Sequence, residues 1–375
     1  MSAMRRAYLD ANATEPLRPE AREAVLAALA VPGNPSSVHA EGRAARRVLE
    51  GAREHLAETL GVRPANIHFT SGGTEANALA IAGFAAAGRR VIISATEHDC
   101  VRGAAAGAEA VPVDAEGVVS LAALAEMLAA DRRPAVVALM LANNETGTLQ
   151  PLAAAAALCR AAGALLHVDA VQGPGRVPLT EAVGLADTLA VSGHKAGGPK
   201  GAGALLVLGE AHPLALIRGG GQERGLRGGT EPLPAIAGMA AAIAAAEAWR
   251  LAGGAERLAG LKARIIASLP ALAPTARVLA AGAETLPNTL SLALPGAPAA
   301  TQVMALDLAG IAVSAGSACS SGKVAESHVL AAMGLGALAG EAIRVSLPWT
   351  ATGEDVDAFL AAYGAMAARL ARQAA

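Results

Sequence analysis

The thiol of Cys319 lies in a run of small residues, 314–322 (SAGSACSSG), in which no other side chain is large enough to pack around it. A buried structural cysteine normally has large apolar neighbours, whereas glycine and serine favour a turn or loop. A thiol in an accessible loop can act as a nucleophile through its thiolate. A loop in which cysteine merely stands in for serine would show the same pattern, so the rest of the chain must decide.

Two charged residues lie at positions that suit carbonyl chemistry. Lys195 stands in a glycine-rich loop, 192–203 (SGHKAGGPKGAG), where partial desolvation would activate its amine to form a Schiff base. The structural alternative is a solvated surface charge. Asp169 ends an apolar run (LLHVD), and a carboxylate is costly to bury there unless it faces a cation.

A third segment, 71–74 (SGGT), directly precedes an apolar stretch of helical character. Small residues and a hydroxyl at a helix N-terminus form an anion site that suits phosphate, although Ser and Thr there could simply cap the helix. Together with Lys195 and Asp169, this cradle completes what pyridoxal phosphate requires: an amine for its aldehyde, a carboxylate for its ring nitrogen and a phosphate site. The sequence therefore predicts pyridoxal phosphate as the cofactor.

The elements that position these residues follow from an alternating pattern. From about residue 60 to 210, short β-branched or apolar runs alternate with alanine-rich stretches, which predicts an α/β domain with a mainly parallel sheet. In such sheets ligands bind beyond the carboxyl ends of the strands, where 143–147 (NNETG) and 169–173 (DAVQG) fall. A long alanine-rich helix, about 232–270, leads to further strands at TLSLAL and IRVSL and to an amphipathic helix from about 353.

Composition excludes several function classes. The 375 residues exceed what one hydrophobic core usually absorbs, so one large and one smaller domain are expected. No run approaches the ~18 apolar residues of a membrane span, so we expect no association with a membrane. The N-terminus lacks a signal-peptide pattern, so we expect a cytoplasmic protein. A net charge of -2, no basic tract and 2% aromatic residues argue against direct nucleic-acid binding. We expect no metal site, because the three cysteines are far apart and unpaired.

The two other cysteines are interpreted as structural. Cys159 lies in a predicted helix interior, 153–163 (AAAAALCRAAG), and should contribute to packing. Cys100 follows His98 by two positions, which leaves open that it approaches the site, but it is interpreted as a buried thiol, and neither cysteine is placed among the catalytic residues.

Further segments, in order from residue 8 to 347, give the chain a wider resemblance. It resembles the cysteine desulfurases of the NifS and IscS type, in the class-V aminotransferase group of fold-type-I pyridoxal phosphate enzymes. The segments that carry this resemblance are YLDANATEPL, GNPSSVHAEGRAAR, IHFTSGGTEAN, ATEHDCV, NNETGTLQP, HVDAVQ, SGHKAGGPKGAGAL, GGGQERGLRGGT, SAGSACSSG and IRVSL.

The resemblance implies a fold-type-I α/β architecture. A large domain, 12–250, would contain a mainly parallel seven-stranded sheet flanked by helices. A smaller α+β domain, formed by 1–11 and 251–375, would carry the catalytic cysteine loop.

The resemblance also implies roles around the cofactor ring. Lys195 would be the Schiff-base lysine, Asp169 the partner of the ring nitrogen and Gln172 the partner of the ring hydroxyl. His98 would stack on the ring and help to move protons. The structural alternatives are that His98 and His194 are ordinary polar loop residues and that Gln172 is a surface amide.

The phosphate would be held by residues from three segments and from a second subunit. The resemblance assigns this role to the backbone around Gly73 and to the side chains of Thr74, Ser192 and His194. Thr230 would reach the phosphate of the neighbouring subunit, which implies a homodimer.

The substrate implied is L-cysteine. Asn143 and Arg344 would bind its carboxylate, which the guanidinium fork suits in a way that lysine does not; a structural ion pair is the alternative for Arg344. Cys319 would be the nucleophile that takes the sulfur, releasing L-alanine and forming a persulfide for a sulfur-acceptor protein such as an iron-sulfur scaffold. Selenocysteine lyase activity is an implied side reaction.

Two other functions stay open. An aminotransferase or lyase of the same fold would use Lys195 and Asp169 but not Cys319, and a noncatalytic sulfur-relay or assembly partner would need none of them. The sequence also departs from the pattern of the family at several loop positions, which concern loop geometry rather than the reaction class. These departures are Glu15, Ala196, Gly197, Pro232 and Pro348.

Overall fold

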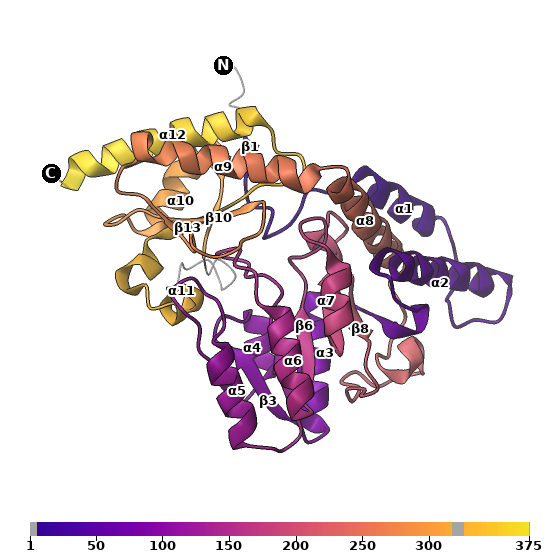
Figure 1. Cartoon of the computed structure of the whole chain (residues 1–375). Helices are drawn as coiled ribbons and strands as arrows, with labels where there is room; N and C mark the ends of the chain where they lie inside the picture. Colours follow the sequence, from indigo (N-terminus) through magenta and orange to yellow (C-terminus); the bar gives the residue numbers. More distant parts are fainter. Residues whose placement is uncertain (1–5, 317–325, 375) are drawn as a thin grey trace.

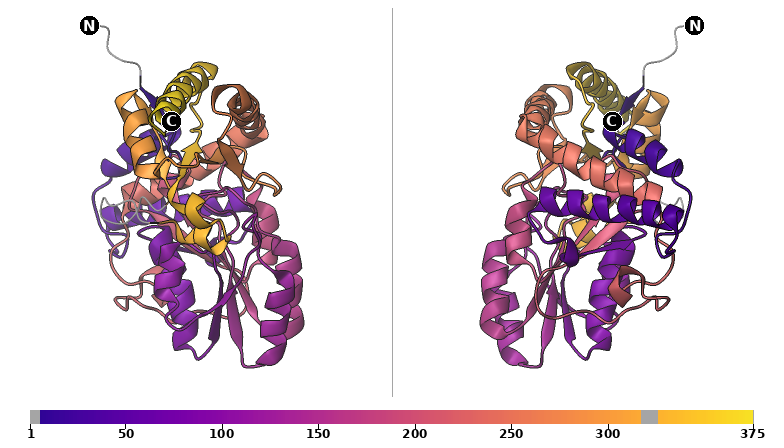
Figure 2. Two further views of the ribbon diagram at one scale, coloured as in Figure 1. Left: turned by 90° about the vertical axis from the view of Figure 1, so that its left-hand side faces the viewer. Right: turned by 90° about the vertical axis from the view of Figure 1, so that its right-hand side faces the viewer.

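The computed structural model describes residues 6–316 and 326–374 of the chain. Its larger part is built on a seven-stranded sheet with helices on both faces (Figures 1 and 2). Across this sheet the strands are β2 (Ile67–Thr70), β8 (Gly203–Val207), β7 (Thr188–Ser192), β6 (Leu165–Asp169), β5 (Ala135–Ala138), β3 (Arg90–Ser94) and β4 (Glu109–Val111). Only β8 among these strands runs against the others. The predicted mainly parallel, seven-stranded sheet is confirmed.

Alternate residues of β5 separate the two faces of the sheet. Val136 and Ala138 pack with apolar residues of α3 and α4, whereas Val137 belongs to the larger core that includes α5, α6 and α7. Successive strand residues point to opposite faces, and a strand covered on both sides therefore reads as a continuous apolar run. These helices are α3 (Gly73–Ala86), α4 (Asp99–Ala104), α5 (Leu121–Ala130), α6 (Leu152–Ala162) and α7 (Leu179–Leu185).

Three further helices pack beside this layer: α1 (Pro19–Leu29), α2 (Ala40–Leu60) and α8 (Leu233–Leu251) (Figure 1). Gly238 lets α1 approach α8 closely, because a Cβ at that position would lie 2.6 Å from Cγ2 of Val25. Short 3₁₀ helices occur at η1 (Pro64–Asn66), η2 (Gly193–Lys195), η3 (Gln222–Gly225) and η4 (Gly336–Gly340).

A second apolar core joins the two ends of the chain. It gathers residues from 7–9 and from 258–367, in a region where α9 and α12 run side by side (Figure 1). Its strands are β1 (Ala7–Tyr8), parallel to β11 (Ile311–Ala312), and the antiparallel set β12 (Ser314–Ala315), β13 (Ala342–Ser346), β10 (Thr289–Ala293) and β9 (Arg277–Leu279). Its helices are α9 (Gly254–Leu272), α10 (Ala299–Leu308), α11 (His328–Ala332) and α12 (Gly353–Ala374).

The alanine-rich stretch at 232–270 is helical as expected, but it is not continuous. The structure has two helices, α8 and α9, separated at Ala252 and Gly253, and Gly253 adopts a left-handed φ of 87°. A left-handed residue ends a helix, and glycine adopts that conformation without steric strain. The alanine-rich composition concealed this break, which lies beside the predicted domain boundary at residue 250.

The described helices include none that is by itself long and apolar enough to cross a membrane. Only α8 and α9 taken together meet that length and composition, and they are bent by 69° at their junction.

Candidate active site

A cavity of about 550 Å³ lies at the carboxyl ends of β6 and β7, next to the N-terminus of α3. Residues that the sequence assigned to a cofactor and its substrate form much of its wall. Those lining it are Gly73, Thr74, His98, Asp169, Gln172, Ser192, His194, Lys195 and Arg344. Cys319 lies outside the described residues.

The amine of Lys195 is held by the N-terminal segment. Its Nζ donates to the carbonyl oxygens of Asn12 and Ala13, at 2.6 and 3.0 Å. Lys195 ends η2, directly after β7, and is partly buried. The fold thus presents an amine at the strand edge where a ligand is expected.

Asp169 ends β6 with its carboxylate fully enclosed. One oxygen accepts from the backbone N–H of Val171 at 3.0 Å and the other from Nδ2 of Asn77 at 2.7 Å. Burial raises the pKa of Asp169, and these hydrogen bonds and the charges of His98 and Lys195 act in the opposite direction. A cation in the cavity would therefore stabilise the ionised form.

Gln172 is held by hydrogen bonds to Asn12 and to Arg176, which belongs to a buried ion pair. Its Nε2 donates to the carbonyl oxygen of Asn12 at 3.1 Å, and its Oε1 accepts from Nη1 of Arg176 at 2.7 Å. Nη2 of Arg176 lies 3.1 Å from Oε2 of Glu15, and both charged side chains are buried. Burial raises the pKa of Glu15, the effect of Arg176 being opposite.

The start of α3 and the end of β7 form a cradle. A Cβ at Gly73 would lie 2.7 Å from Cγ2 of Val171 and 3.3 Å from Cβ of Ser192, so only glycine fits there without displacement. The buried hydroxyl of Ser192 has no hydrogen-bond partner among the described residues. An unsatisfied buried hydroxyl beside a helix N-terminus is an arrangement that an anion would complete.

His194 lies beside this cradle as a neutral imidazole. Its Nδ1 is 3.1 Å from Oγ1 of Thr14. Burial, and then the positive charges of Lys195 and Lys200, lower its pKa to about 4. It can therefore donate or accept a hydrogen bond at neutral pH without adding charge.

His98 caps α4 and contacts a thiol. Its Nδ1 accepts from the backbone N–H of Cys100 at 3.1 Å and lies 3.0 Å from Sγ of the same residue. Cys100 lines the cavity, and Nδ2 of Asn77 is 3.3 Å from its sulfur. The interpretation of Cys100 as a buried thiol apart from the site is therefore wrong, whereas Cys159 is buried in α6 as expected.

Arg344 lies on β13 and reaches the cavity, where it is already paired. Its Nη2 donates to Oδ1 of Asp10 at 2.7 Å and its Nη1 to the carbonyl oxygen of Asn144 at 3.1 Å. Its buried Nε has no partner within the described part of the chain. Asn143 does not line the cavity, because its side chain bonds the backbone of Thr96 and of the following turn, and the neighbouring Asn144 lines it instead.

Thr230 is exposed and does not line the cavity of its own chain. Its Oγ1 lies 3.5 Å from Nδ2 of Asn34. The structure therefore places it where it contributes nothing to the site of the same subunit.

Four of the five departures from the family pattern lie close together next to the site. Oε1 of Glu15 accepts from the backbone N–H of Trp349, which follows Pro348. Nε of Arg18 donates to the carbonyl oxygen of Ala196 at 2.9 Å, and Gly197 packs so tightly that a Cβ would lie 2.7 Å from Cγ of Arg18. The departures are parts of one packed cluster, which a position-by-position reading of the sequence does not reveal.

Asn77 and Arg176 are site residues that sequence reasoning missed. Asn77 follows Gly73 by one helical turn, and Arg176 follows Gln172 by four positions. A polar side chain in an otherwise apolar helix was the available signal for Asn77. The described residues contain no cluster of three or more histidine, cysteine, aspartate or glutamate side chains arranged for a metal ion.

Residues 7–359 match the family described as aminotransferase class-V. The chain belongs to this family. The chain is 43% identical over 373 residues to a cysteine desulfurase of Cereibacter sphaeroides, and the match covers 95% of this chain and 94% of that protein. It is 38% identical to an IscS-like cysteine desulfurase of Mycobacterium tuberculosis, covering 98% of both chains.

The fold of the chain is similar to that of solved structures. A NifS-like protein from Rickettsia africae superposes with a TM-score of 0.89 at 33% identity, covering 96% of this chain and 99% of that chain. A second NifS-like protein gives a TM-score of 0.88 at 34% identity, covering 97% and 100%. The predicted membership of the NifS/IscS-like group and the predicted fold class are confirmed.

Proposed function

We propose that this member of the class-V aminotransferase family is a cysteine desulfurase that uses pyridoxal phosphate to take sulfur from L-cysteine. The observation that carries the proposal is that one cavity joins the amine of Lys195, the carboxylate of Asp169 and the cradle at Gly73. The similarity to cysteine desulfurases over nearly the whole chain supports the same reaction.

The cavity residues fit pyridoxal phosphate. The backbone at Gly73 leaves room that a Cβ would fill, and the hydroxyl of Ser192 is buried without a partner among the described residues. Phosphate oxygens would accept from this hydroxyl and from the N–H groups at the start of α3. Gly73, Thr74, Ser192 and His194 would hold the phosphate.

The ring would lie among the other lining residues. When bound, pyridoxal phosphate supplies an electron sink at the α-carbon of the substrate. Lys195 would hold its aldehyde carbon, Asp169 would face its ring nitrogen and Gln172 would donate to its ring oxygen. His98 would lie against the ring and exchange protons with the substrate.

Arg344 would bind the substrate carboxylate. The guanidinium already lies in the cavity, held by Asp10, and its Nε is unsatisfied within the described residues. A substrate carboxylate would compete with Asp10 for the same fork, so binding would exchange one charged hydrogen bond for another. Asn144 lines the cavity, whereas Asn143 does not. The role of Asn143 in binding the substrate carboxylate stays a prediction.

Cys319 would receive the sulfur. Its thiolate would attack the substrate sulfur, so that an S–S bond forms as the C–S bond of the substrate breaks, and the carbon skeleton would leave as L-alanine. The persulfide would then pass to an acceptor protein, for which an iron-sulfur scaffold is one candidate class.

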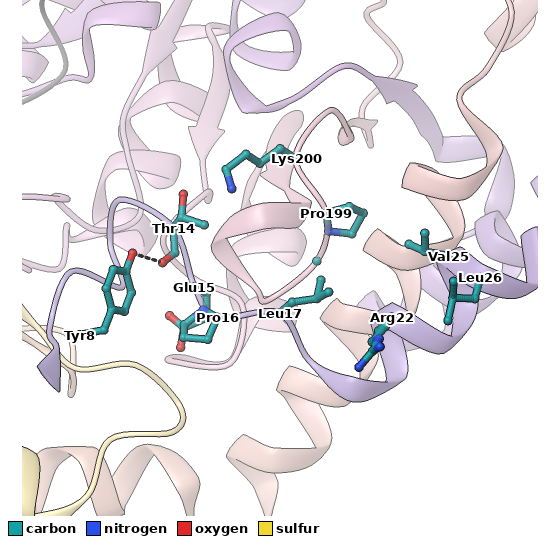
Figure 3. Close-up of a pocket in the computed structure, with 11 residues that line it drawn as sticks. Tyr8, Thr14, Glu15, Pro16, Leu17, Arg22, Val25, Leu26, Pro199 and Lys200 are labelled. Atoms are coloured by element: carbon teal, nitrogen blue, oxygen red, sulfur yellow. Dashed lines mark hydrogen bonds between the residues drawn. The ribbon is translucent and has the colours of Figure 1, made fainter. Parts of the chain in front are cut away.

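We propose a homodimer in which Thr230 reaches the phosphate of the partner subunit. Thr230 is exposed and does not line the cavity of its own chain. Apolar side chains are also exposed near α1: Leu17 is 49% exposed and Leu26 58%. Both line a second cavity of about 460 Å³, shown in Figure 3, which a second copy would cover.

Mixed dimers test this arrangement. If Thr230 acts across the interface, a mixture of Lys195→Ala and Thr230→Val subunits contains one fully native site, and activity rises above that of either variant alone. If Thr230 acts within its own chain, mixing restores nothing. A monomeric mass by light scattering with full activity would contradict the dimer itself.

Paired release of alanine and sulfide from L-cysteine with a reductant tests the reaction. The cofactor-loaded protein should give equal amounts of both, and Cys319→Ser should give neither while its visible absorption survives. Cys159→Ala is the matched control, because this cysteine lies buried in α6. Turnover of another amino acid without sulfide release would favour an aminotransferase or lyase.

A further inference from the structure

The orientation of the Gln172 amide is set by its neighbours. Guanidinium nitrogens only donate hydrogen bonds, so the group that lies 2.7 Å from Nη1 of Arg176 must be the amide oxygen. The amide nitrogen then faces the carbonyl oxygen of Asn12, which only accepts. A turned amide would place donor against donor and acceptor against acceptor, so this orientation is the one that satisfies all three groups.

This orientation determines what Gln172 offers to a ligand. The amide nitrogen has two hydrogens, and Asn12 accepts one of them. The oxygen is directed to Arg176. Because Gln172 lines the cavity, the second N–H is the group left for a ligand atom, and an acceptor suits it.

Arg176 is held in place by more than this one contact. Its Nη1 also donates to the backbone oxygen of Gln172 at 3.1 Å, and its Nη2 pairs with Glu15. The side chains of Arg176 and Glu15 are 4% and 6% exposed. A buried guanidinium without a counter-charge would be strongly destabilising, so Glu15 is what allows Arg176 to remain behind the cavity wall.

The ion pair also ties Gln172 to distant segments. Glu15 belongs to the N-terminal segment, and its second oxygen accepts from the backbone N–H of Trp349 at 2.5 Å. The pair therefore joins the loop after β6 to both ends of the chain. Glu15 is one of the departures from the family pattern, and its contacts with Arg176 and Trp349 explain its presence at this position.

We propose that Arg176, balanced by Glu15, is a positioning residue that turns Gln172 so that only an N–H faces the cofactor ring. The site then favours the deprotonated form of the ring oxygen. An N–H donor stabilises an anionic oxygen acceptor more strongly than it stabilises the neutral hydroxyl form of the same oxygen. The inference rests on the proposed function, in which the cavity holds pyridoxal phosphate.

The pH titration of the visible absorption of the cofactor-loaded protein tests the proposal. Arg176→Met keeps the length of the side chain but removes the donors, so the amide is released to turn. We expect the spectral midpoint to move upward by roughly one pH unit, the size of effect that follows from losing a hydrogen bond to a charged group. Arg176→Lys restores a donor and should return the midpoint toward that of the unaltered protein.

Glu15→Gln separates positioning from stability. It keeps an acceptor oxygen for Nη2 of Arg176 but removes the counter-charge, so the urea midpoint of unfolding should fall while the spectral midpoint moves far less than in Arg176→Met. If Arg176 were merely structural, Arg176→Met and Glu15→Gln would both lower stability and neither would move the spectral midpoint. That result would overturn the proposal.

Gln172→Glu supplies a second route in case Arg176→Met does not fold. The new carboxylate retains a partner in Arg176 and presents only acceptor atoms to the ligand. The spectral midpoint should rise by at least as much as in Arg176→Met, and an unchanged midpoint overturns the proposal. Absence of any cofactor absorption in the unaltered protein would instead refute the proposed function.

Discussion

Sγ of Cys100 lies 3.0 Å from Nδ1 of His98 and 3.3 Å from Nδ2 of Asn77. The amide of Asn77 donates to the sulfur, and both the thiol and the backbone N–H of Cys100 lie within hydrogen-bond distance of the single acceptor site at Nδ1 of His98. Since Asn77 also donates to Asp169, one buried amide supports residues on two sides of the cavity. The cavity thus contains a thiol that is not the predicted nucleophile.

This placement predicts selective alkylation. In Cys319→Ser, iodoacetamide should modify Cys100 roughly a hundredfold faster than Cys159, whose pKa burial raises to about 12. Bound pyridoxal phosphate should slow the modification of Cys100, because the residue lines the cavity. Peptide mass spectrometry over time measures both rates. Equal rates at the two cysteines, or no protection by the cofactor, would contradict the placement.

Gly73→Ala should weaken cofactor binding by at least about tenfold, because the added methyl group meets Val171 and Ser192 in the cavity wall. Titration of the visible absorption measures the affinity. Adding Val171→Ala makes room for the methyl group and should recover part of the loss. The matched control is Gly51→Ala in α2, where nothing lies within 4 Å of the new Cβ. A loss of affinity in the control would show that the effect is not local.

Glu223→Gln should destabilise the fold by about 3 kcal/mol or more. Arg53 donates to both oxygens of Glu223, at 2.8 and 2.9 Å, and the two side chains are only 3% and 1% exposed. Urea unfolding measures the loss. Arg46→Ala breaks the exposed pair with Glu50 on the same helix and should change stability by less than about 1 kcal/mol. Similar effects of both changes would contradict the importance of burial.

His167 should make the fold sensitive to acid. Burial lowers its pKa to about 3 from the ordinary 6.5, so the unfolded chain binds a proton at pH values where the folded protein does not. Stability therefore falls as pH drops below 6.5, by up to about 1.4 kcal/mol per pH unit for this one group. Urea unfolding between pH 5 and 7 measures the slope.

His167→Gln is the test of that assignment. Glu97 contributes the opposite slope, because burial raises its pKa and its contribution to stability is lost as pH rises above the ordinary value of 4.5. Glu97 is the same in both proteins, so the difference between their slopes isolates His167. Identical slopes would mean that His167 accepts a proton in the folded state.

Most of the site residues that the sequence could predict lie at the carboxyl ends of strands. Asp169 and Ser192 end apolar runs, and Lys195 follows Ser192 by three positions. A parallel sheet brings the three residues to one edge, so their proximity could be predicted without knowing their contacts. TLSLAL and IRVSL became β10 and β13, and the terminal helix begins at Gly353 as expected.

The residues that escaped prediction depend on contacts between distant segments. Arg176 gains its role from Glu15, 161 positions away, and Cys100 from the turn that α4 makes at His98. Asn143 does not line the cavity although Asn144 does, because a tight turn directs the side chain of Asn143 to the backbone; its role in substrate binding stays a prediction. Short sequence motifs give no information about contacts between residues that lie far apart in the chain.

The pairing of β1 with β11 has a consequence for synthesis on the ribosome. Ala7 pairs with Ile311, and the next segment supplies the carbonyl oxygens of Asn12 and Ala13 that hold Lys195. At about 5–20 residues per second, the first strand waits roughly 15 to 60 seconds for its partner to be made. The amine is therefore positioned only after residue 311 has been made, so a nascent chain that stops before this residue has no completed site in which to retain the cofactor.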